Sequence, residues 1–222
     1  MARQVRKSKK VIYVFCEGKS EKEYAEYLRE TFKDVSAMHI PSPASTCLFK
    51  DTKSKFDKDA RFYKNAEAID EIWFFFDAED QDADQWEKRL KIIKQLRGLR
   101  KKPNIRVRLL MTSACVEYWF RLHYEMAAPA LHTKADKENA LHWIQQRIPG
   151  YKKGDSGAIK QIAANWPTAA QHGEVVLAQL TEHGMPPVGV KNSDERDAWL
   201  HRNKYTFTTV QEAIRFLESL RE

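Results

Sequence analysis

The sequence predicts an α/β fold: a parallel sheet with helices on both faces, followed by a mainly helical C-terminal part. Three apolar runs, at 11–16, 71–76 and 105–111, have the length of buried strands, and helical patterns separate them. Strands that are apolar throughout are typical of parallel sheets whose two faces are both covered by helices. Beyond about residue 130 the strand signal ends, so only helices are expected there.

The elements of the first 126 residues follow in order from the spacing of apolar side chains. Ser20 and Glu23 form the pattern of a capping box, and the helix that follows has Tyr24, Tyr27 and Leu28 on one face. We expect strands at 11–16, 35–40, 71–76 and 105–111, and helices at 20–32, 56–69, 82–99 and 114–126.

The rest of the chain is predicted to form five helices joined by Gly, Pro and Asn turns. They are expected at 137–148, 157–166, 174–184, 194–203 and 208–220, the last with a threonine cap. Because no low-complexity linker interrupts the chain, these helices should pack on the α/β unit. We therefore divide the chain into a basic arm at 1–10, an α/β domain at 11–126 and a helical region at 127–222.

Composition excludes several classes of protein. With 222 residues, 42% of them hydrophobic and 11% aromatic, the chain can bury a substantial core. No window approaches the roughly 18 apolar residues of a membrane span, and the basic N-terminus lacks a signal-peptide cleavage pattern, so a cytoplasmic protein without membrane contact is expected. The cysteines, Cys16, Cys47 and Cys115, lack CxxC spacing and predict neither disulfides nor a zinc site.

The net charge of +7 is concentrated in two segments. Residues 1–10 contain basic side chains and no acid, and residues 87–108 contain ten Lys or Arg against the single acid Glu87. Such density suits a nucleic-acid backbone, although a solvated arm and a solvated helix face remain the alternative. The candidate nucleic-acid contacts are Lys88, Lys91, Lys94, Arg97 and Arg100.

Carboxylates follow two of the predicted strands directly. Glu17 comes after the run 11–16, and Asp77 and Glu79 come after the run 71–76. In an open parallel sheet the ligand crevice lies beyond the carboxyl ends of the strands, so these acids should converge there. Crowded carboxylates repel one another unless a cation joins them, and Mg²⁺ prefers such oxygen ligands. An acidic turn that caps the next helix is the alternative.

Other catalytic motifs are missing. The sequence has neither GxGxxG nor GxxxxGK[ST], which disfavours dinucleotide and Walker-type nucleotide sites, and it has no Ser or Cys nucleophile motif. His123 is more typical of an ordinary core or surface histidine than of a catalyst.

Three segments together resemble a known family. They are VFCEGKSEKEY, FFFDAEDQD and TSACVEYWFRLHYE, and with weaker matches at 151–155 and near the C-terminus they resemble the RloB-like family of bacterial defence-locus proteins, which are similar to Toprim domains. The matching residues are Glu17, Gly18, Ser20, Glu21, Asp77, Asp80, Cys115, Glu117, Trp119 and His123.

The resemblance implies a Toprim-like core in which a glutamate acts as acid/base and a D-x-D pair holds Mg²⁺ (or Mn²⁺). Carried over, Glu17 is the acid/base and also a metal residue, and Asp77 is the principal metal ligand. The second aspartate of D-x-D is Glu79 here, and Asp80 is a substitute ligand. Glu117, one turn into its helix, is expected to face the site, although Ser113 and Ala114 replace the Asn and Pro of the family pattern.

The function implied is a metal-dependent nuclease that cuts RNA, with tRNA as one candidate, and acts as a toxic effector in anti-phage defence. Relatives are typically encoded beside ATPases of the ABC or AAA kind, so such a partner is expected. A non-catalytic binding subunit held by that ATPase is the first alternative, and a housekeeping Toprim enzyme that matures structured RNA is the second. The oligomeric state stays open.

Overall fold

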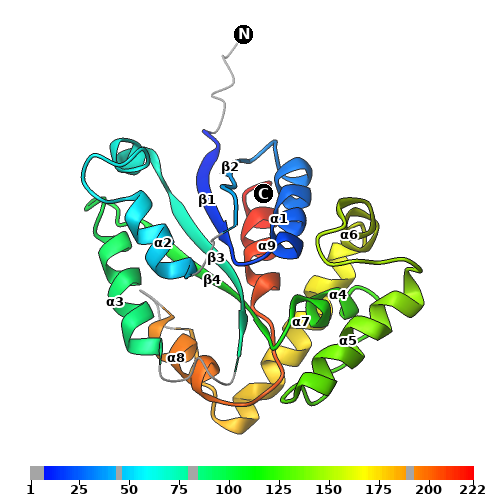
Figure 1. Cartoon of the computed structure of the whole chain (residues 1–222). Helices are drawn as coiled ribbons and strands as arrows, with labels where there is room; N and C mark the ends of the chain where they lie inside the picture. Colours follow the sequence, from blue (N-terminus) through cyan, green and yellow to red (C-terminus); the bar gives the residue numbers. More distant parts are fainter. Residues whose placement is uncertain (1–7, 44–46, 80–84, 189–192) are drawn as a thin grey trace.

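The computed structural model describes residues 8–43, 47–79, 85–188 and 193–222. Its centre is a parallel sheet of four strands in the order β2-β1-β3-β4, with a layer of helices on each face (Figure 1). The strands are β1 (Lys10–Cys16), β2 (Ser36–His39), β3 (Glu71–Ala78) and β4 (Arg106–Ser113). The predicted α/β class and parallel sheet are therefore confirmed.

The two central strands, β1 and β3, determine where a ligand site can form. After β1 the chain passes to β2 on one side, and then crosses to β3 on the other side. The pairing continues to the end of β1, where the backbone N–H of Glu17 donates to the carbonyl of Phe75 at 3.0 Å. Such a reversal of direction opens a crevice at the carboxyl ends of the two strands.

Alternate side chains of each strand enter different cores. One face of the sheet is covered by α1 and α9, with α4–α7 packed beside them, and the other face by α2, α3 and α8 (Figure 1). The helices are α1 (Lys19–Thr31), α2 (Leu48–Lys55), α3 (Trp86–Arg97), α4 (Val116–Arg121), α5 (Lys134–Arg147), α6 (Ser156–Ala163), α7 (Trp166–Gln179), α8 (Asp194–Arg202) and α9 (Val210–Ser219), with 3₁₀ turns η1 (Tyr63–Ala68) and η3 (Leu180–His183).

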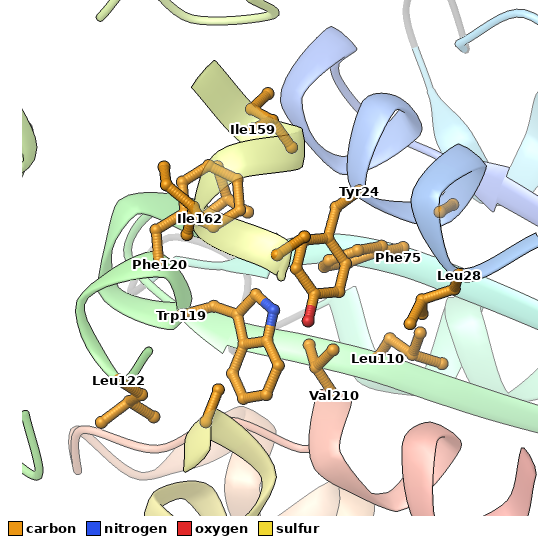
Figure 2. Packing of buried hydrophobic residues seen from close by; sticks show 14 of the residues in the cluster. Tyr24, Leu28, Phe75, Leu110, Trp119, Phe120, Leu122, Ile159, Ile162 and Val210 are labelled. Carbon is orange, nitrogen blue, oxygen red and sulfur yellow. The ribbon is translucent and has the colours of Figure 1, made fainter. Parts of the chain in front are cut away.

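The first of these cores joins α1, β3 and α4 through aromatic side chains (Figure 2). The ring of Tyr24 meets those of Phe75 and Trp119 edge-on, with centroids 6.2 and 5.7 Å apart. The hydroxyl of Tyr24 is 3.0 Å from Nε2 of His123, and the other ring nitrogen of that histidine is 3.0 Å from the carbonyl of Trp119. Burial lowers the pKa of His123 to about 3, so it stays neutral and belongs to the core.

The segment before α9 fastens the C-terminal helix to the edge of the sheet. Thr208 forms an antiparallel bridge with Thr112, and the hydroxyl of Thr209 donates to the carbonyl of Leu109 at 2.7 Å. The same hydroxyl accepts the backbone N–H of Met111 at 2.8 Å. The predicted threonine cap is therefore wrong in its role: Thr209 stands at the N-cap position of α9, but its side chain bonds to β4 instead of the helix.

Two further local predictions are also wrong. No α-helix forms at 56–69: α2 ends at Lys55, and only the 3₁₀ turn η1 lies within the predicted range. Between them Asp59 has a φ of 76°, which is incompatible with a helix. The capping box of Ser20 and Glu23 is absent, because α1 begins after Gly18 without a side-chain cap. Ser20 instead accepts the backbone N–H of Gly154 at 2.9 Å.

One predicted helix is shorter in the structure: the helix expected at 114–126 forms only the short α4. Cys16 and Cys115 are buried in the core, and Cys47 is exposed. Of the basic arm expected at 1–10, residues 1–7 lie outside the described part. No described helix combines the length and the apolar character that crossing a bilayer requires.

Candidate functional site

Four acidic side chains, which we call the carboxylate cluster, meet at the carboxyl ends of β1 and β3. Glu17 follows β1 and Asp77 lies near the end of β3, and an oxygen of Glu17 accepts the backbone N–H of Asp77 at 3.1 Å. Glu21 comes from the first turn of α1 and Glu117 from the first turn of α4. Glu21 and Glu117 are 4% and 0% exposed, so two of the four acids are withdrawn from solvent.

The electrostatics of the cluster centre on Asp77. Burial raises the pKa of its carboxyl well above the ordinary range, and the charges of Glu21, Glu17 and Glu117 raise it further. One oxygen of this carboxyl, Oδ1, is buried and has no hydrogen-bond partner within the described chain. Burial also raises the pKa of Glu21, to about 7, with the charges of Glu17 and Glu117 adding to the effect. Without a bound metal, the negative charges of the four acids repel one another, which is unfavourable for the fold.

Glu117 is placed by a strained turn and held by two groups from outside the α/β unit. Ala114, between β4 and α4, has a φ of 63°, a left-handed conformation that is uncommon for alanine. The hydroxyl of Tyr151 donates to Oε1 of Glu117 at 3.2 Å, and the ammonium of Lys153 lies 3.3 Å from Oε2. This oxygen receives no hydrogen bond from the described residues, so its contact with Lys153 is an ion pair.

The loop that carries Lys153 is fastened to the start of α1. Besides the hydrogen bond from Gly154 to Ser20, Gly154 has a φ of 78°, and a Cβ there would lie 2.8 Å from the Cβ of Lys19. Glycine is therefore required by both conformation and space. The side chain of Lys153 remains 60% exposed, so this cation can move without disturbing a packed core.

The structure brings some of the predicted acids together and not others. Glu17, Asp77 and Glu117 come together as expected, whereas Glu79 forms an ion pair with Lys137 of α5. Asp80 and the rest of the acidic turn at 80–84 lie outside the described residues. Glu21 and Lys153 were not predicted as site residues. The weak signals for them were the second glutamate of CEGKSE and the YKKGD segment.

The five basic candidates of and after α3 fall into two groups. Lys88, Lys91 and Lys94 are exposed. Arg97 instead binds both oxygens of Asp194 at 2.7 and 3.0 Å, and Arg100 donates to the carbonyls of Pro103 and Glu67 at 2.8 and 3.2 Å. These two arginines hold α8 and the end of α3 in place. Of the five candidates, the three lysines are therefore the ones that face solvent.

The carboxylate oxygens of the cluster are the type of ligand that a hard divalent cation prefers. The unpaired, buried Oδ1 of Asp77 and the Oε2 of Glu117 are the carboxylate oxygens that Mg²⁺ prefers. Across the described ranges, however, no three His, Cys, Asp or Glu side chains are arranged to hold a metal together. A cation here would thus have few protein ligands, which is common for Mg²⁺ because it keeps several waters and binds substrate phosphates.

The comparisons with known proteins agree with the three sequence segments. A family model described as RloB-like protein matches residues 12–217, which includes every residue of the carboxylate cluster together with Lys153. No curated protein and no solved structure matches the chain at a significant level. On the extent of that family match, the chain belongs to the RloB-like family.

Proposed function

We propose that the protein is a Toprim-type, Mg²⁺-dependent nuclease that hydrolyses phosphodiester bonds, RNA being the favoured substrate and tRNA one candidate. The observation that carries the proposal is Asp77: the Oδ1 of its carboxyl is buried without a partner among the described residues, and three further acids surround it at the switch point of a parallel sheet. An arrangement this unfavourable in the absence of a cation is typical of functional sites.

In this proposal Asp77 and Glu117 hold the metal, with Mn²⁺ as an accepted substitute. When bound, the metal supplies charge stabilisation for the scissile phosphate and lowers the pKa of a water. Glu17 is exposed at the edge of the cluster, and the N–H of Asp77 fixes one of its oxygens, so it can move a proton as general acid/base. We assign the second ligand position to Glu117 and not to Glu79, because the charge of Glu117 acts on Asp77 within the cluster, whereas Glu79 is bound to Lys137 of α5.

The biological role we propose is that of a toxic effector in anti-phage defence. The support is membership of a family whose relatives are typically encoded beside ABC or AAA ATPases. An ATPase of this kind is therefore the proposed partner, with the helices after residue 130 as its docking region. Induced expression of the wild type and Glu17→Gln in a bacterial host, with total RNA and genomic DNA compared at early times, should give toxicity and discrete RNA fragments in the wild type alone.

A second candidate is a non-catalytic subunit of an ATPase complex. The ion pairs of Glu117 with Lys153 and of Glu79 with Lys137 favour it, because they show two acids of the region already neutralised by lysines. In that case the cluster is structural, and a divalent cation has no role.

Calorimetric titration with Mn²⁺ discriminates the two. The nuclease proposal expects heat of binding in the wild type and none in Asp77→Asn. Glu67→Gln, which removes an exposed acid in η1 far from the cluster, is the matched control and should bind like the wild type. No heat in the wild type, or equal heat in Asp77→Asn, supports the non-catalytic subunit.

A further inference from the structure

A cleft of about 390 Å³ opens beside the carboxylate cluster, on the face of the sheet covered by α2 and α3. These two helices lie next to each other on that face (Figure 1). Glu17 lies in the lining, so the cleft is continuous with the cluster. The other lining residues are Cys47, Leu48, Phe49, Lys50, Phe76, Gln85, Lys88, Arg89 and Ile92.

Among the described residues that line this cleft, Glu17 is the acid and the other charges are positive. Arg89 is fixed in place: its guanidinium lies 5.0 and 5.1 Å from the ring centroids of Phe49 and Phe76, and one of its nitrogens is 2.6 Å from Nε2 of His201. Lys50 on α2 and Lys88 on α3 are exposed, and no described carboxylate forms an ion pair with either. The cleft therefore combines an aromatic floor, a fixed cation and two lysines on opposite walls.

We propose that this cleft receives one unpaired nucleotide of a single-stranded nucleic acid, with Lys50 and Lys88 contacting its phosphates. The inference rests on the proposed nuclease function, which places the scissile phosphate at Glu17 and Asp77. The volume is at the lower end of the roughly 300–1,000 Å³ of ligand-sized pockets and suits about one nucleotide. A base held within a duplex cannot enter such a cleft, so the substrate must be single-stranded or locally unpaired there.

Binding can be measured apart from cleavage. The full chain is titrated in EDTA against a fluorescein-labelled, unstructured RNA of about 12 nucleotides and against the same sequence as a duplex, with anisotropy as the readout. The wild type should bind the single strand at least about 10-fold more tightly than the duplex. The double variant Lys50→Gln, Lys88→Gln should bind the single strand about 10-fold more weakly at low salt, since two phosphate contacts are lost.

The salt dependence gives the sharper prediction. Each phosphate contact on a single strand contributes about 0.7 to the slope of log K against log salt, so the double variant should reduce the slope by about 1.4. Lys58→Gln, Lys160→Gln removes the same charge at exposed positions outside the cleft and should leave the slope unchanged. Equal binding of duplex and single strand, or an equal reduction in slope by the control, would overturn the proposal.

The experiments distinguish an error in the cleft proposal from an error in the nuclease proposal. In EDTA, Asp77→Asn should bind the oligonucleotide at least as tightly as the wild type does, because the cleft does not need the metal and the variant removes an acid beside the phosphate. Single-strand binding through Lys50 and Lys88 together with no Mn²⁺ binding would refute the nuclease and keep the cleft as a binding site. Mn²⁺ binding and cleavage with no effect of the two lysines would refute the cleft alone.

Discussion

Strand β3 has an acidic side chain near each end, and their surroundings are opposite. Glu71, at the start, receives hydrogen bonds from Arg108 at 3.1 and 3.2 Å and from the indole N–H of Trp73 at 2.6 Å. Asp77, near the other end, has an oxygen without a described partner and three acids around it. The fold thus provides hydrogen-bond partners for the buried carboxylate of Glu71 on the same strand. We therefore attribute the missing partner of the Asp77 oxygen to function.

The largest change in stability is expected at the start of β3, where Arg108 binds Glu71. Arg108→Met should lower the free energy of unfolding by about 3–5 kcal/mol, because it leaves the buried charge of Glu71 uncompensated. Urea denaturation measures this. The control is Arg215→Met, which removes a more exposed ion pair with Glu174 and should cost less than about 1 kcal/mol. Equal losses in the two variants would mean that the Glu71 end of the strand is not specially stabilised.

An intermediate effect is expected at Lys153. Lys153→Met removes the cation that faces the fully buried Glu117, and should cost about 1–3 kcal/mol of unfolding free energy in metal-free protein. Lys137→Met removes the equivalent cation from the partly exposed Glu79, and should cost less than about 1 kcal/mol. If Mn²⁺ recovers the stability of the first variant and not of the second, the cluster at Glu117 is the one that accepts a cation.

The last effect depends on pH. In the folded protein Glu21 keeps its proton up to about pH 7, whereas in the unfolded chain it ionises near its ordinary pKa of 4.5. The stability of metal-free protein should therefore fall as the pH rises between these values. Glu21→Gln cannot ionise, so at pH 8 its melting temperature should exceed that of the wild type by about 2–4 °C per kcal/mol gained.

The two melting temperatures should agree at about pH 3, well below the ordinary pKa of 4.5, where the glutamate is protonated in both states. Thermal unfolding followed by circular dichroism in EDTA at the two pH values checks both statements. A variant that melts at the same temperature as the wild type at pH 8 would show that the cluster does not strain the fold.

Much of the fold and part of the site follow from sequence because they depend on local pattern. The apolar runs ending at Cys16 and Phe76 place Glu17 and Asp77 at the carboxyl ends of neighbouring parallel strands. The turn after β4 likewise brings Glu117 to the same edge. The parallel sheet alone predicts that Glu17 and Asp77 converge, whereas Glu117 was expected there only from the family resemblance.

The remainder could not be predicted because it depends on contacts between distant segments. Ser20 matches a capping box by sequence, yet its partner is Gly154, from a loop that also supplies Lys153. Thr209 matches a helix cap and binds β4 instead. A short, charged helix such as α2 gives little apolar periodicity, so the wall of the cleft that carries Lys50 was missed.

The most direct test of the account is cleavage by purified protein. Wild type and Asp77→Asn are incubated with end-labelled single-stranded RNA and DNA, in Mg²⁺ or Mn²⁺ and in EDTA, after urea denaturation has shown that the variant is folded. We expect the wild type to cut with the metal and not in EDTA, and the equally stable variant to lose at least about 10³-fold in rate. Cleavage by Asp77→Asn at the wild-type rate, or by the wild type in EDTA, would contradict the central claim.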